Sequence, residues 1–162
     1  MLFHSIQRHY AICSLRELPA IGKRDPRFWN VISVLENSAP QVSTQGFLKN
    51  IRVACDDVTE FVPGVEVPGS KQIDEVFRFA DSVFGEPLLI HCMFGESRSP
   101  AIALLLMMRD MQMDGYAAEE CANASRRFLL TIRPQAKPNP LILETGIRML
   151  FDPSEFDRIQ QA

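Results

Sequence analysis

The sequence predicts an α/β domain with a central, mostly parallel sheet of four or five strands and helices on both faces. Strand-like and helix-like segments alternate along the chain, which is typical of parallel strands joined by crossover helices. The segment Pro87–Ile90 is short and wholly apolar, as expected of a strand that is buried on both faces. Because the chain has 162 residues and no internal repeat, residues 1–162 are expected to form one domain.

Three further strands are predicted before that apolar segment. His9–Ser14 and Val31–Leu35 are short runs of residues with β propensity, and Asn50–Cys55 alternates in polarity. The third of these strands ends at two aspartates, Asp56 and Asp57. Several prolines and glycines follow the aspartates, so a constrained loop is expected there.

Helices are predicted after this loop and again after the apolar strand. The apolar positions from Ile73 to Val83 fall on one face of a helix that begins with Ser70 as its N-cap. Ser99 and Pro100 suit the start of a second helix, from Ala101 to about Gln112, which is apolar on nearly every side and is therefore expected in the interior. Two more helices are expected over residues 117–130 and 141–151.

The composition argues against several classes of protein. The longest apolar run, residues 101–108, is far shorter than the roughly 20 residues of a membrane-spanning helix, so no membrane span is expected. The first ten residues lack the charged start and apolar stretch of a secretory signal. A net charge of −3 gives no general attraction to nucleic acid, and none is expected as a partner.

The cysteines indicate a reducing environment. Cys13, Cys55, Cys92 and Cys121 lie far apart in the sequence and form neither a dense disulfide framework nor a CxxC metal pattern. The chain has only three histidines, which makes a zinc site improbable. We therefore predict free thiols, a cytoplasmic location, no metal and no cofactor.

The predicted chemistry lies in the loop that follows the apolar strand, His91 to Pro100, with the sequence HCMFGESRSP. A strand–loop–helix turn aims backbone N–H groups and the positive end of the helix at one point, which makes an anion site. The same dipoles would stabilise a thiolate at Cys92. Arg98 offers a planar fork for two phosphate oxygens, and Gly95 lets the loop curl tightly. The pattern predicts a nucleophile inside a phosphate-binding loop.

This loop resembles the signature of the cysteine-based protein tyrosine phosphatase superfamily, HCxxGxxR followed by Ser or Thr, and looks most like the compact dual-specificity branch. The chain matches every signature position: His91, Cys92, Gly95, Arg98 and Ser99. Upstream, the segment ACDDVTEFVPG is similar to the general-acid loop of that family. Downstream, Pro138-Asn139 resembles the pair that opens its final helix.

The resemblance implies a hydrolase of phosphate monoesters that works through a phosphocysteine intermediate. Cys92 would be the nucleophile, and Ser99 would help its sulfur to leave in the second step. His91 would support the loop and the ionisation of the cysteine. The phosphoryl group would be bound by the loop residues Met93, Phe94, Gly95, Glu96, Ser97 and Arg98.

The resemblance also implies a general acid in the upstream loop. The motif D-x-x-E-F aligns with Asp57 to Phe61 and favours Asp57 as the acid. Asp56 is the alternative, and its side chain would point the other way from an extended backbone. Asn139 is expected to hold the start of the last helix near the loop.

The loop composition favours a phosphorylated protein as the substrate. Residues 93–97 contain one acid, Glu96, and no Lys or Arg. This favours phosphotyrosine, with or without phosphoserine and phosphothreonine, over phosphoinositides or RNA 5′-triphosphates, which carry more charge. Met93 and Phe94 would either contact a phenyl ring or face the core. Inorganic phosphate, sulfate or vanadate would occupy the same loop.

Three alternative functions remain open from the sequence. The first is a non-catalytic phosphate-binding module, and the second is a phosphatase for a non-protein substrate. The third is a sulfur-transfer or arsenate-reducing enzyme that uses the same thiolate loop.

Overall fold

The protein has a five-stranded sheet in a computed structural model that describes residues 2–3, 7–60 and 62–161. The strands are β1 (Leu2–Phe3), β2 (Arg8–Ser14), β3 (Asn30–Leu35), β4 (Asn50–Ala54) and β5 (Leu88–Cys92). Their order is β1-β2-β5-β3-β4; only β1 is antiparallel to its neighbour, and the other pairs are parallel. The predicted fold class is confirmed.

The central position of β5 explains its composition. This strand pairs with β2 on one side and β3 on the other, so that Ile90 lies between Ile12 and Ile32. Every residue of β5 is buried. A strand that is covered on both faces has no position for a solvated side chain, which accounts for the unbroken apolar run before His91.

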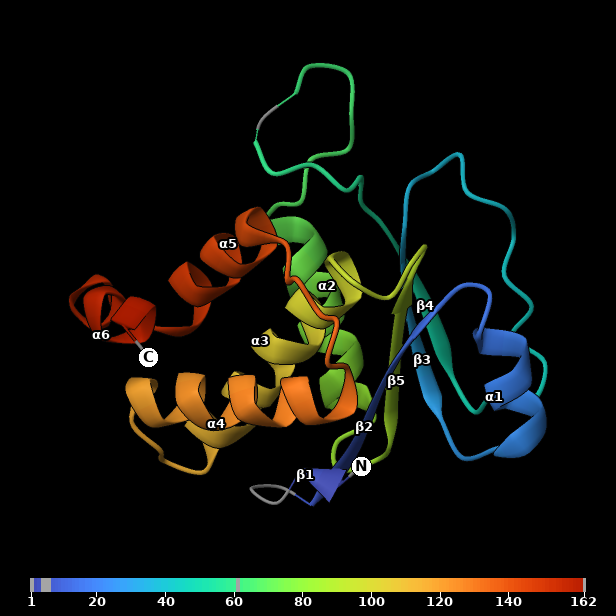
Figure 1. The fold of residues 1–162 in the computed structure, drawn as a ribbon, viewed down its shortest axis with the longest axis horizontal. Coiled ribbons are helices and arrows are strands. Elements are labelled where there is room, and N and C mark those ends of the chain that lie inside the picture. Colours follow the sequence, from blue (N-terminus) through green and yellow to red (C-terminus); the bar gives the residue numbers. More distant parts are fainter. Residues whose placement is uncertain (1, 4–6, 61, 162) are drawn as a thin grey trace.

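Helices cover both faces of the sheet, as predicted (Figure 1). On one face lies α1 (Leu18–Arg24), where Leu18 packs against Val31 and Leu89. Alternate strand residues, including Ile32 and Ile90, face the larger core on the other side. The helices on that side are α2 (Ser70–Ser82), α3 (Arg98–Met113), α4 (Ala118–Ile132), α5 (Pro140–Leu150) and, after a 3₁₀ turn at Pro153–Glu155, α6 (Phe156–Gln161).

Two predicted helix starts are wrong by a small margin. The helix α3 begins at Arg98 with Ser97 at its N-cap, ahead of the predicted start at Ser99. Pro100 is still tolerated, because the amides of the first turn have no acceptor within the helix. The N-cap of α2 is Gly69, whose amide donates to the side chain of Gln72 at 3.2 Å.

Four short elements were not predicted, namely β1, α1, the 3₁₀ turn and α6. The helix α1 contains Pro19 and Gly22, which both have low helix propensity. Gly22 packs closely against Phe47, because a Cβ there would lie 2.9 Å from the end of that ring. Tertiary contacts therefore decide that this segment is helical.

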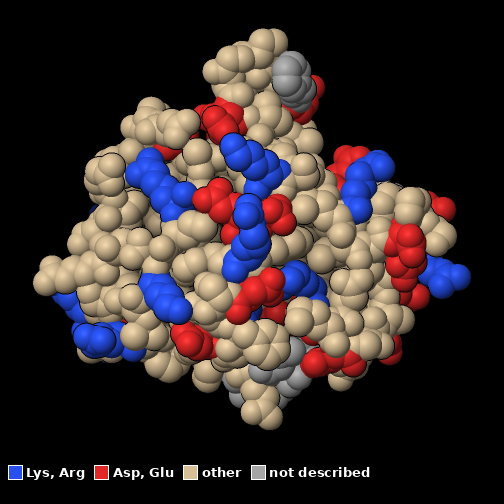
Figure 2. All heavy atoms as spheres, turned by 180° about the vertical axis from the view of Figure 1, so that it is seen from behind, with Lys and Arg blue, Asp and Glu red and all other residues tan. Residues whose placement is uncertain are grey.

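Charged side chains of both signs are interspersed on the face of the molecule shown in Figure 2. Several of the exposed charges are paired, for example Arg78 with Asp74 at 2.9 Å and Arg148 with Glu144 at 2.8 Å. A mixed surface of this kind does not present a single-sign field to a polyanion. Within the residues described, none of the helices combines the length and apolarity needed to cross a bilayer.

We expect Gly146 to be required for the contact between α5 and α3. A Cβ at this position would lie 2.6 Å from Cδ2 of the buried Leu105. The change Gly146→Ala should lower the free energy of unfolding by about 1–3 kcal/mol through overpacking, despite the higher helix propensity of alanine. Chemical denaturation measures this loss.

The matched control places the same change in a Leu105→Ala background, where the added methyl group enters vacated space. In that background Gly146→Ala should be neutral or stabilising. An equal loss of stability in both backgrounds would contradict the packing explanation.

Candidate active site

The candidate site is the loop between the carboxyl end of β5 and the amino end of α3. Cys92 is the last residue of β5 and Arg98 is the first residue of α3, so the two predicted reactive groups stand on buried elements. Because a packed strand and a packed helix hold its ends, the loop has little freedom to change shape.

The carbonyl oxygens of residues 92–97 all accept hydrogen bonds from outside the loop. The donors are the backbone amides of Leu15, Lys137 and Asn139 and the guanidinium of Arg133, at distances between 2.7 and 3.2 Å. They come from the segment after β2 and from the connection between α4 and α5. The loop is therefore held by its carbonyl groups from two sides.

Outward carbonyl groups leave the amides of the loop pointing inward. In a trans peptide unit the N–H points opposite to the C=O, and the described residues contain no cis peptide bond. The amide of Gly95 illustrates this, since it donates to the sulfur of Cys92 at 3.3 Å. Gly95 has a φ of 72°, and a Cβ there would lie 2.7 Å from the backbone of Cys13. Only glycine fits this turn.

The sulfur of Cys92 lies in an environment that favours the thiolate. Its residue is only 1% exposed, and burial by itself raises the pKa of the thiol. The hydroxyl of Ser99 donates to the sulfur at 3.1 Å. This bond, the amides of Ser99 and Gly95 and the charge of Arg98 outweigh burial, so the pKa of Cys92 is lowered.

The other three cysteines behave as core residues. All are buried and free. Burial raises the pKa of Cys13 and of Cys55 to about 12 and the pKa of Cys121 to about 11. Cys92 is therefore the cysteine with the strongest thiolate character.

Arg98 is held in the interior by two acceptors on one nitrogen. Its Nη1 donates to Oε2 of Glu36 at 2.6 Å and to the carbonyl oxygen of Cys55 at 2.7 Å. Its Nε is buried without a hydrogen-bond partner and lies 3.7 Å from Oδ2 of Asp57. The guanidinium thus has a fixed orientation and a free donor, although the residue is only 3% exposed.

Glu36 was not identified from the sequence. It directly follows β3 in a polar segment, with no motif around it. The hydrogen bond from Arg98 lowers the pKa of its carboxyl, which keeps it ionised beside the guanidinium. Only the sheet order, which places β3 beside β5, brings this carboxylate to the site.

The two aspartates after β4 have different surroundings. Oδ1 of Asp57 accepts hydrogen bonds from the hydroxyl of Ser97 at 2.6 Å and from Nδ2 of Asn139 at 2.9 Å. Asp57 therefore lies against the loop between β5 and α3. Asp56 instead bonds Glu66 twice, through its carboxylate at 2.7 Å and its amide at 2.9 Å, and so closes the base of its own loop. Phe61, the last residue of the aligned motif, lies outside the described residues.

Asn139 lies where it was expected and also contacts the acid loop. Its side-chain oxygen accepts from the amides of Leu141 and Ile142, which makes it the N-cap of α5. Its Nδ2 group donates to Asp57 and to the carbonyl oxygen of Val58. One amide side chain therefore connects a helix start to the candidate acid.

His91 supports the sheet and brings no charge to the sulfur. Its Nε2 lies 2.6 Å from the hydroxyl of Ser33 on β3. Burial lowers the pKa of the ring to about 4, so that it is neutral at pH 7. The expected help to the ionisation of Cys92 therefore cannot come from a histidine cation.

The sequence also did not reveal the ion pair between Glu17 and Arg133. The guanidinium of Arg133 bonds the carbonyl oxygens of Phe94 and Gly95, and it also pairs with Glu17 at 3.1 and 3.2 Å. The hydrogen bond from Arg133 lowers the pKa of Glu17 to about 2. Arg133 ends α4 and Glu17 follows β2, so this contact depends wholly on the tertiary structure.

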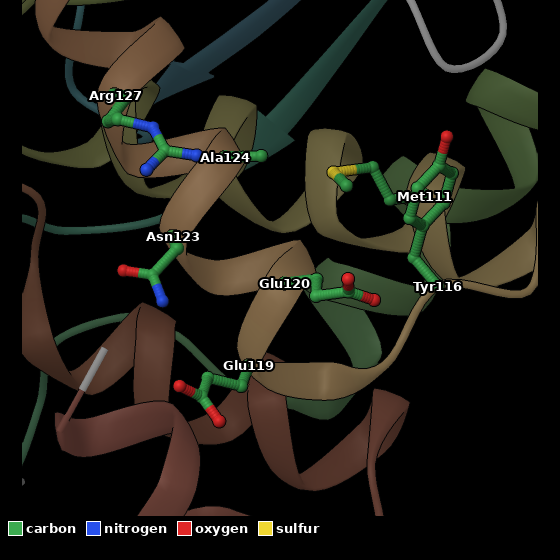
Figure 3. A pocket seen from close by; sticks show the side chains of 7 residues that line it. All are labelled: Met111, Tyr116, Glu119, Glu120, Asn123, Ala124 and Arg127. Carbon is green, nitrogen blue, oxygen red and sulfur yellow. The ribbon is translucent and has the colours of Figure 1, made fainter.

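One surface hollow lies away from the predicted site residues. A pocket of about 350 Å³ lies over α4 and the turn before it, with Met111, Tyr116, Glu119 and Arg127 in its lining (Figure 3). It adjoins the carboxyl end of α3, whereas the candidate site lies at the amino end of that helix. In the described part of the chain, His, Cys, Asp and Glu form no group of three or more that could hold a metal ion.

The fold has counterparts among solved structures. It superposes on human DUSP28 with a TM-score of 0.63 and 19% identity, over 93% of this chain and 90% of that chain. DUSP15 superposes with a TM-score of 0.61 and 22% identity, over 94% of this chain and 88% of that chain. Tk-PTP in its active form superposes with a TM-score of 0.58 and 22% identity, over 88% of this chain and 90% of that chain.

These likenesses establish that the chain has the fold of the compact dual-specificity phosphatases. No protein-family model matches the sequence, and a search of curated proteins found no match. Identities of 19–22% indicate a shared fold, and a fold by itself does not fix a function.

We predict that Ser99→Ala raises the pKa of Cys92. The substitution removes the hydroxyl donor at 3.1 Å, and a hydrogen bond to a charged group contributes about 1.5–3 kcal/mol, or about one to two pH units. The ultraviolet absorbance of the thiolate, followed against pH with Cys92→Ser as the blank, measures the midpoint. An unchanged midpoint in Ser99→Ala would show that the hydroxyl does not stabilise the thiolate.

Proposed function

We propose that this protein hydrolyses phosphate monoesters through a phosphocysteine intermediate, with phosphotyrosine in proteins as the preferred substrate. One observation carries the proposal. A thiol of lowered pKa and a buried guanidinium with a free Nε lie at the two ends of one loop whose amides point inward. This arrangement suits a tetrahedral dianion bound above a nucleophile.

The chemistry would proceed in two steps. In the first, the sulfur of Cys92 attacks phosphorus, the bond to the leaving oxygen breaks, and Asp57 gives that oxygen a proton. In the second, Asp57 takes a proton from water, the water attacks phosphorus, and the sulfur leaves as a thiolate that accepts the Ser99 hydrogen bond. Arg98 and the loop amides would stabilise the charge on the phosphoryl oxygens throughout.

A non-catalytic binding module is the main alternative, and the fold does not decide against it. One solved structure with this fold, at a TM-score of 0.55 and 17% identity, is a human tyrosine phosphatase-like serine/threonine/tyrosine-interacting protein. A protein that only binds phosphate has no use for a stabilised thiolate or for an acid held over the loop. Both features support turnover in this chain.

A phosphoinositide is the alternative substrate. PTPMT1, solved in complex with PI(5)P, superposes with a TM-score of 0.56 and 20% identity. Between Cys92 and Arg98 the present loop has no basic residue and one exposed acid, Glu96. A headgroup with several phosphates would meet fewer cations here, which favours a substrate with a single phosphate.

Turnover of an aryl phosphate in the presence of a metal chelator tests the proposal. We expect hydrolysis that vanadate inhibits and that Cys92→Ser abolishes. Cys121→Ser, a change at another buried cysteine, is the matched control and should keep the activity. Tight binding of phosphopeptides without any turnover in the wild type would instead support the binding module.

We expect Asp57→Asn to reduce kcat for a phosphotyrosine peptide by about 10²–10⁴-fold, because general acid catalysis contributes on that order. Asparagine keeps an oxygen that can accept from Ser97 and Asn139, so the loop should stay in place. Asp56→Asn is the matched control and should remain near the wild-type rate, since it can still accept from the amide of Glu66.

The comparison of the two aspartates also separates reaction classes. A large loss in Asp56→Asn with none in Asp57→Asn would transfer the role of the acid to Asp56. Full activity of both variants on the peptide would show that neither aspartate is the general acid. Sulfur transfer or arsenate reduction, which need no carboxylic acid, would instead be favoured if the wild type did not hydrolyse the peptide at all.

A further inference from the structure

An aromatic side chain stands exposed in the middle of the phosphate loop. Phe94 is 70% exposed, more than any other large hydrophobic residue in the exposed set of the described chain. Met93 beside it is half-buried. Single exposed hydrophobic residues are common on protein surfaces, so this ring is distinguished by its place in the loop and not by its exposure alone.

The loop does not need this ring for its own structure. The conformation at Phe94 is held through the backbone, because its carbonyl oxygen accepts from Nη2 of Arg133 at 3.2 Å and the next amide donates to the sulfur of Cys92 at 3.3 Å. The ring itself is not part of either hydrophobic core cluster. The backbone at Phe94 is therefore held in place, while the ring itself is largely exposed.

The position of Phe94 brings its ring within reach of a leaving group. Phe94 is two positions after Cys92, so their Cα atoms are at most about 7 Å apart, and the ring extends further. A phosphate seated on the sulfur must project its ester group out of the loop toward solvent. An aryl group is flat, apolar and long enough to leave the loop beside this ring, whereas the short methylene of a phosphoserine carries no such surface.

We propose that Phe94 is a specificity-determining residue that packs against the aromatic ring of a phosphotyrosine and so selects aryl over alkyl phosphates. This inference rests on the proposed function for the identity of the bound phosphate. Contacts between two aromatic rings strengthen binding by about two- to twelve-fold beyond the burial of area alone. The preference should thus be of about tenfold and confined to aromatic esters.

The test measures dissociation constants in a Cys92→Ser background, where turnover cannot interfere. The probes are two peptides of identical sequence with phosphotyrosine or phosphoserine at the same position, and inorganic phosphate. Adding Phe94→Ala should weaken binding of the phosphotyrosine peptide about tenfold and leave the other two within about twofold. Phe94→Trp should retain the tight binding, because it keeps a large aromatic surface.

A control variant tests whether the loss of any exposed apolar side chain, rather than of Phe94 in particular, weakens binding. Met113 is 53% exposed at the last residue of α3, which places it about 22 Å along the helix from Arg98. Met113→Ala should change none of the three dissociation constants. In the enzyme with an intact Cys92, Phe94→Ala should lower kcat/KM for the phosphotyrosine peptide by the same factor of about ten.

Two outcomes would overturn the inference. Equal weakening of all three ligands by Phe94→Ala would mean that the substitution disturbs the loop, and no weakening of any ligand would mean that the ring does not contact the ester. Both differ from failure of the proposed function, which would show as absent turnover with an intact Cys92 while the aryl preference in binding persists.

Discussion

The site depends on one constraint, namely that the carbonyl oxygens of residues 92–97 are all held from outside the loop. Backbone amides and the guanidinium of Arg133 supply these hydrogen bonds. Because each peptide unit is planar, fixing its oxygen also fixes its N–H on the opposite side. Six oriented peptide units aim partial positive charge into the loop, which adds to the hydrogen bond from Ser99 and the charge of Arg98 in stabilising a thiolate at Cys92.

The parallel sheet explains why these groups meet. The carboxyl ends of parallel strands lie at one edge of the sheet. Each of the four parallel strands, β2, β3, β4 and β5, is followed by or ends in a residue of the site. Glu17 follows β2, Glu36 follows β3, Asp57 follows β4 and Cys92 ends β5. The buried guanidinium of Arg98 is stabilised in this setting because Glu36 and the carbonyl oxygen of Cys55 compensate for the loss of water.

Contacts between distant segments also separate residues that look alike in the sequence. Asp56 and Asp57 are adjacent, yet one closes its own loop through Glu66 and the other lies against Ser97 and Asn139. All four cysteines are buried, yet the pKa is lowered only at the one that faces the loop amides and Ser99. Burial by itself would have made Cys92 as inert as the others.

The sequence by itself determined the α/β class, the long helices and the loop from His91 to Ser99, because these depend on local periodicity and on the spacing of neighbouring residues. It left α1 unpredicted, since Pro19 and Gly22 oppose a helix that only packing stabilises. The contacts of Glu36 with Arg98 and of Glu17 with Arg133 were decided by the tertiary structure alone. Each of these side chains acts on a partner dozens of residues away, and such a partner is set by strand order and helix packing, which no local pattern encodes.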